Sequence, residues 1–105
     1  MMMNDGCAVT VDIAGRPMRL CYTINSLCAL EDRAGMPIDR LMDRQFSATR
    51  LVRWAGLTHC QPELTVTDVG NLIGRELQMG GTLEDIVDMC AEGLRAAGFF
   101  GGEDR

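Results

Sequence analysis

Alternating apolar and polar residues predict a β-hairpin near the start of the chain. The alternation runs over residues 9–13, is interrupted by Ala14-Gly15-Arg16, and resumes over residues 18–22. Pro17 lacks an amide donor, so the second strand is expected to lie at a sheet edge. A lone hairpin is marginally stable in water, and its apolar face must therefore lie against helices. That face comprises Val9, Val11, Ile13, Leu20 and Tyr22.

Two helices are expected next. Thr23 or Asn25 can cap the first, and Gly35 supplies the left-handed conformation that ends it. We expect this first helix to be largely buried. Met36-Pro37 opens a short second helix that ends near Arg44. The inward-facing residues are expected to be Leu27, Cys28, Leu30 and Ala34 in the first helix and Ile38, Leu41 and Met42 in the second.

A third helix is predicted from Ser47, as its cap, to a point before Pro62. Its apolar positions fall at i, i+3, i+4 and i+7, the spacing of one helix face. Trp54, the single tryptophan, is expected to flank that face. The face consists of Ala48, Leu51, Val52 and Ala55.

The C-terminal third predicts two more helices. Thr65 or Thr67 starts the fourth, which Gly80-Gly81 closes, and Thr82 caps the fifth, which continues to Gly98. The apolar side of the fourth helix is Val69, Leu72, Ile73 and Leu77. Leu83, Ile86, Val87, Cys90 and Leu94 are expected to form the most buried stripe of the protein.

This pattern predicts an α+β fold, in which an N-terminal β-hairpin packs against a bundle of four to five helices. A chain of 105 residues supports one core. We expect a single domain over residues 8–100, between a flexible N-terminus (1–7) and a flexible C-terminal tail (101–105). Phe99 and Phe100 are expected to fold back on the core.

Charge narrows the function classes. The net charge is −5 and the chain has no lysine, which argues against binding to a nucleic-acid backbone. Residues 61–105 are the acidic part, with 9 Asp or Glu against 3 Arg. No targeting segment and no long apolar run are present, so neither secretion nor membrane insertion is expected. The predicted location is the cytoplasm.

The five cysteines have spacings that match neither a disulfide framework nor a zinc module. A reducing compartment explains them, so we expect structural thiols, no native disulfide and no bound metal. No cofactor-binding loop is recognisable either, because the glycines form neither GxGxxG nor a P-loop. No cofactor is therefore expected.

Catalytic constellations are also lacking. His59 and Cys60 are neighbours, which in a helix point about 100° apart and cannot form a nucleophile–base pair. The arginines at 40, 44, 50 and 53 are interleaved with acids and are interpreted as solvated helix surface. We therefore expect a protein that is not an enzyme and has no catalytic residues.

One charged feature is a candidate partner-binding site. Glu84, Asp88 and Glu92 repeat one turn apart along the last helix. Like charges at this spacing cost roughly 0.2–0.5 kcal/mol per pair. A basic partner surface would explain this acidic stripe, and so would simple solubility.

The layout resembles a family of small tail-morphogenesis proteins of phages, prophages and gene transfer agents. The resemblance lies in the hairpin, in the segment from Thr23 to Glu31 that runs into Gly35, in Phe46–Val52, and in the closing helix Leu83–Phe100. It spans about residues 8–100. It implies a tail assembly chaperone that binds the tape-measure protein in the bacterial host cell.

The alternative is a structural subunit of the tail tube. Tube subunits rely on extensive sheet, and this chain predicts a single hairpin, which favours the chaperone. In either case the expected partners are proteins, with a homo-oligomer possible and with no nucleic acid and no membrane.

Overall fold

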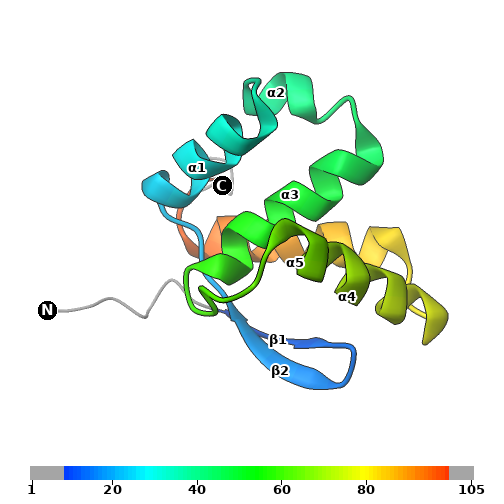
Figure 1. The fold of residues 1–105 in the computed structure, drawn as a ribbon. Helices are drawn as coiled ribbons and strands as arrows, with labels where there is room; N and C mark the ends of the chain where they lie inside the picture. Colours follow the sequence, from blue (N-terminus) through cyan, green and yellow to red (C-terminus); the bar gives the residue numbers. More distant parts are fainter. Residues whose placement is uncertain (1–8, 100–105) are drawn as a thin grey trace, which may run out of the picture.

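The computed structural model describes residues 9–99. The fold is α+β: an N-terminal antiparallel hairpin packs against helices, as predicted (Figure 1). The expectations for residues 1–7, Phe100 and the tail 101–105 lie outside the described residues. The elements are β1 (Val9–Ile13), β2 (Arg16–Leu20), α1 (Ile24–Ala34), α2 (Ile38–Leu41), α3 (Gln45–Thr58), α4 (Val66–Gln78) and α5 (Leu83–Ala96).

The hairpin turns over two residues. Ala14 and Gly15 both have positive φ, 53° and 84°, which is the conformation of the tight turns that match strand twist. The register pairs Val9 with Leu20 and Ile13 with Arg16. One face is apolar as predicted, with Val11, Ile13, Met18 and Leu20 buried against the helices.

Helix α3 is the centre of the molecule. It contacts α1, α2, α4, α5 and β2, and Figure 1 shows it between the hairpin on one side and α1 and α2 on the other. The predicted face Ala48, Leu51, Val52 and Ala55 is buried. Trp54 flanks this face and is half-buried, with Arg33 of α1 5.9 Å above its ring.

The segment after β2 is locked between α3 and α5. The Tyr22 hydroxyl donates to the carbonyl oxygen of Val52 at 2.7 Å, and the Cys21 amide donates to that of Gly56 at 2.9 Å. A Cβ built on Gly56 would lie 2.6 Å from the Tyr22 ring, and one on Gly93 would lie 3.1 Å from it. Both helices therefore approach the tyrosine closely because they carry glycine there.

Three of the predicted helix starts are confirmed. Thr23, Thr65 and Thr82 each cap a helix, and each side-chain oxygen accepts from the third backbone amide of its helix. The prediction of Ser47 as a cap is wrong. Helix α3 begins at Gln45, and the residue before it, Arg44, accepts the first helical bond from the Ala48 amide at 2.7 Å.

Burial differs from the prediction at several places, among them α1, Met42 and α5. Helix α1 is peripheral and not largely buried, since only Ser26 and Leu30 are buried and Cys28 is exposed. Met42, predicted to face inward, is 56% exposed. Within α5, Ile86 and Cys90 are buried, but Val87 is 47% exposed, so the predicted stripe is not the most buried part of the protein. Residues 83, 87 and 94 lie towards the flank of the core face, which accounts for their exposure.

Candidate protein-binding surfaces

An apolar groove lies between α3 and α5, and we call it the α3–α5 groove. It has a volume of about 420 Å³. Two of its side chains, Met42 and Val87, are about half exposed, although both are large and apolar. Its apolar lining consists of Met42, Ala48, Val52, Val87, Cys90, Ala91 and Leu94, with Gln45 and Thr49 as polar members.

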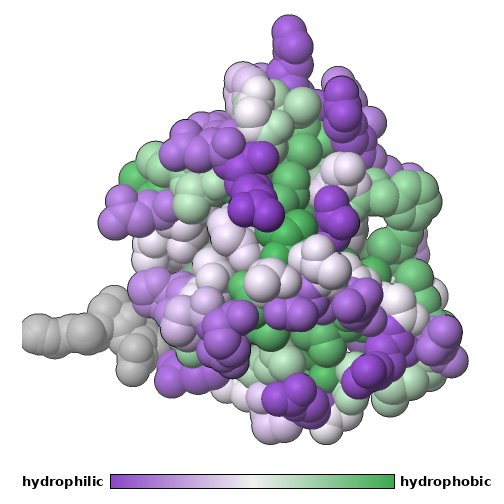
Figure 2. Space-filling view, in the orientation of Figure 1, coloured by the Kyte–Doolittle hydropathy of each residue, from purple (hydrophilic) through white to green (hydrophobic). Residues whose placement is uncertain are grey.

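A second, smaller groove lies on the other side of the start of α3, against α4. It has a volume of about 280 Å³ and includes Phe46, which is 72% exposed, and Leu77, which is 41% exposed. Figure 2 shows apolar surface between polar side chains on the face of the molecule that it draws. The start of α3 therefore has apolar surface on two sides, which is typical of an interaction region.

The predicted acidic stripe is solvent-exposed. Glu84, Asp88 and Glu92 all lie on the outer side of α5. Asp88 and Glu92 line a groove of about 400 Å³ between α5 and β1, whereas Glu84 does not line it. The structure thus brings two of the three residues to one concave surface and adds Asp85, which the sequence pattern did not single out.

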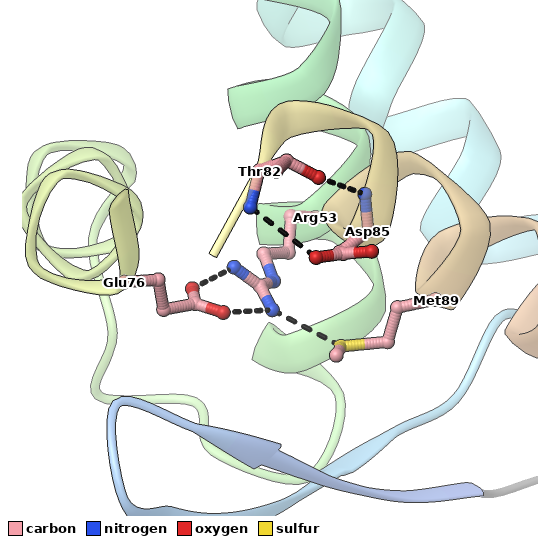
Figure 3. Close-up of polar contacts among 5 residues, drawn as sticks. All are labelled: Arg53, Glu76, Thr82, Asp85 and Met89. Carbon is pink, nitrogen blue, oxygen red and sulfur yellow. Dashed lines mark hydrogen bonds and ion pairs between the residues drawn. The ribbon is translucent and has the colours of Figure 1, made fainter. Parts of the chain in front are cut away.

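A buried ion pair occupies the region between α3, α4 and α5 (Figure 3). The Arg53 guanidinium donates through two nitrogens to the Glu76 carboxylate, and the second nitrogen also lies 3.1 Å from the sulfur of Met89. The Arg53 side chain is fully buried, and that of Glu76 is 11% exposed. Thr82 and Asp85, which form the α5 cap, lie beside the pair.

The interpretation of Arg53 as solvated surface is wrong. Arg53 lies between the core positions Val52 and Ala55 and faces inward, where Glu76 supplies its counter-charge. Its Nε has no hydrogen-bond partner in the described part of the chain. Glu76 is 23 residues away, which is why no local pattern signalled the pair.

Burial also perturbs two acidic groups near the hairpin. Burial raises the pKa of the Tyr22 phenol well above its ordinary value, and the neighbouring Cys90 thiol adds to the rise. Burial likewise raises the pKa of Cys90, against a smaller lowering by the hydrogen bond with Tyr22. Both groups are therefore held neutral, which does not favour a reactive thiolate.

The expectation of no native disulfide is contradicted. Cys21 is disulfide-bonded, whereas Cys28, Cys60 and Cys90 are free. Spacing along the chain failed here because it does not report which cysteines meet in space. Cys28 and Cys60 are exposed.

The remaining candidate residues form no metal site within residues 9–99. His59 is exposed at the end of α3. Within residues 9–99 no group of three or more His, Cys, Asp or Glu side chains is placed to hold a metal ion. None of the helices in that range has the length and apolar character needed to cross a membrane.

No protein-family model, no curated protein and no solved structure matches this chain.

Proposed function

We propose that this chain is a non-enzymatic morphogenesis protein of a phage or gene-transfer-agent tail, specifically a tail assembly chaperone that binds the tape-measure protein. The observation that carries the proposal is the α3–α5 groove. It is apolar along most of its lining and leaves Met42 and Val87 half exposed. An amphipathic helix can lay its apolar residues into a groove of this kind.

The lining suits a helper that must bind a long partner at several places. Met42 has three rotatable bonds and a polarisable sulfur, so it adapts to different side chains. Binding surfaces that rely on such adaptable residues accept related sequences instead of a single one. Long apolar helices, which the tape-measure protein is expected to contain, would be kept soluble in this way.

The acidic stripe complements this groove. Asp88 is next to Val87 on α5 but points about 100° away from it and faces the groove between α5 and β1, so a partner longer than the α3–α5 groove would meet the carboxylates beyond its rim. Contacts of this kind at a rim affect association rate and salt dependence more than the fold. Glu84, Asp88 and Glu92 thus remain our candidate partner-binding residues.

The site of action in this proposal is the cytoplasm of the bacterial host. A reducing compartment would open the Cys21 disulfide, so the working form would contain a thiol there. The chaperone should consequently bind its partner in the presence of reductant.

Co-expression with the tape-measure gene of the same cluster tests the proposal. Val87→Glu places a charge in the α3–α5 groove and should abolish co-purification without unfolding the protein, because the site is half exposed. Ile24→Glu is the matched control: Ile24 is 63% exposed and lies outside the groove, so its variant should bind normally.

Replacing Glu84, Asp88 and Glu92 together by Arg should leave thermal stability nearly intact and weaken co-purification, most clearly at low salt. Failure of the wild type to bind the tape measure would refute the chaperone. Rings of the purified protein in electron micrographs would instead indicate the tail-tube subunit.

A further inference from the structure

The two edges of the hairpin differ in the hydrogen bonds that they form within residues 9–99. On the β2 edge, the Arg19 amide donates to Oε1 of Gln61 at 3.0 Å, and Nε2 of Gln61 donates to the Arg19 carbonyl at 3.0 Å. The Gln61 side chain therefore takes the place of a neighbouring strand. Pro17, two residues earlier, has no amide to offer. The β2 edge is closed to further pairing.

The same bonds identify the outward groups of β1. In an antiparallel pair, residues alternate between those bonded to the opposite strand and those facing away from it. Arg19 faces away, towards Gln61, so its partner Thr10 must also face away, on the other side of the sheet. Asp12, the partner of Pro17, faces the same way as Thr10.

The outward groups of β1 are unpaired within residues 9–99. No hydrogen bond to the main chain of Thr10 or Asp12 is formed there apart from the strand ladder, and both residues are exposed. An open strand edge of this kind is a template for another strand. Within residues 9–99, one edge of the sheet is closed and the other is open.

A groove runs along the open edge. It has a volume of about 400 Å³ and lies between β1 and α5; we call it the β1–α5 groove. Thr10 belongs to the outer face of the hairpin and Val11 to the inner face, and both line the groove, which places it at the strand edge. Val9 and Met89 add apolar surface.

The opposite wall of this groove is acidic. Asp85, Asp88 and Glu92 of α5 line it. Asp85 caps its helix through Thr82, but Asp88 and Glu92 form no ion pair within the described residues. A segment that pairs with β1 would run beside these carboxylates, so arginine or lysine side chains would be favoured there.

We propose that β1 accepts an extended basic segment of a partner protein as a third strand, seated in the β1–α5 groove. Main-chain bonds to Thr10 and Asp12 hold the segment, and Asp85, Asp88 and Glu92 select its charge. A second copy of this chain is disfavoured as the occupant, because pairing two β1 edges would bring two acidic walls together. This inference is independent of the α3–α5 groove, where a helix is the expected ligand.

The probe is a fluorescent heptapeptide of alternating valine and arginine, measured by anisotropy, with amide chemical shifts recorded in parallel. Binding should shift the amides of Thr10 and Asp12, and should weaken steeply with added salt. The same peptide with glutamate in place of arginine should not bind. Methylation of two adjacent central amides, one on each peptide edge, should also abolish binding.

Thr10→Pro removes an outward amide without removing a ladder bond, so it should weaken binding at least about tenfold while the fold persists. Asp88→Asn combined with Glu92→Gln should weaken it about tenfold at low salt. Glu63→Gln is the control, since Glu63 is an exposed carboxylate that lies outside the groove, and it should bind as the wild type does.

Three results would overturn the proposal: no binding of the basic peptide, undiminished binding of its methylated form, or equal effects of the Glu63 variant and the Asp88/Glu92 variant. A dimer that Thr10→Pro dissociates would assign the edge to a second copy instead. Because these measurements use a peptide and not the tape-measure protein, their failure is distinguishable from failure of the chaperone proposal.

Discussion

The Arg53–Glu76 pair permits a sharp prediction about stability. The Arg53 side chain is fully buried, pairs with the Glu76 carboxylate and contacts the Met89 sulfur. The Glu76 side chain is 11% exposed. Removing one partner of a buried pair costs about 3–5 kcal/mol because the other charge is left uncompensated. The cost should therefore depend on which partner is removed.

Glu76→Leu leaves the guanidinium buried without its counter-charge, so we expect a loss of about 5 kcal/mol, the upper end of that range. Arg53→Met leaves a carboxylate that can turn towards water and fills most of the vacated volume, so we expect about 3 kcal/mol. The double variant replaces the pair by apolar side chains and should lie within about 1 kcal/mol of the wild type.

Urea unfolding of the four proteins, followed by circular dichroism, gives the free energies of unfolding for this double-mutant cycle. The stability of a domain of this size is about 5–15 kcal/mol, so a loss of 5 kcal/mol is readily measured. The reasoning is refuted if the double variant loses as much as the two single variants together. It is equally refuted if Arg53→Met is the more damaging single change.

Two further predictions follow from packing and burial. Gly56→Ala should lower the free energy of unfolding by about 1–3 kcal/mol, because its Cβ would lie 2.6 Å from buried side chains. Gly74→Ala has open space around the new Cβ and should raise the free energy of unfolding by up to about 1 kcal/mol. A change of the same sign for both variants in urea unfolding would contradict this. Burial raises the pKa of Cys90 and of Tyr22, so both groups keep their protons in the folded protein, and in alkali the unfolded state binds fewer protons than the folded state. The free energy of unfolding should therefore fall above about pH 8.5 because of the thiol and above about pH 10 because of the phenol. The expected fall is about 1.4 kcal/mol per pH unit for each group. Cys90→Ala should flatten the first part of this profile in alkaline urea titrations, and the same flattening in the exposed-thiol variant Cys28→Ala would count against burial as the cause.

The order and type of the elements could be predicted because their signals are local. Alternation over residues 9–13 and 18–22 indicated the hairpin, and candidate caps that included Thr23, Thr65 and Thr82 indicated the starts of α1, α4 and α5. The start of α3 was predicted at the wrong residue because no side chain caps this helix. Periodicity also identified the core face of α3, which neighbouring elements cover on several sides.

The sites were determined by contacts between distant residues. The sequence indicated a surface position for Arg53, because its counter-charge Glu76 comes from α4 and is distant in the chain. The sequence likewise assigned no role to Gly56 or Gly93, whose close approach to Tyr22 depends on how α3 and α5 pack. The acidic repeat on α5 was visible in the sequence, but the fact that Asp88 and Glu92 share a groove with β1 while Glu84 does not was decided by how α5 lies against the hairpin.

The two edges of the hairpin also show which features a residue determines locally and which depend on tertiary contacts. Pro17 alone predicted that β2 is an edge strand, because a missing amide is a property of the residue itself. That the edge is also closed depends on Gln61, which lies 42 residues from Arg19 and reaches it only after α3 has packed on β2. A local pattern can specify which backbone groups face outward, but only tertiary packing decides which of them find a partner.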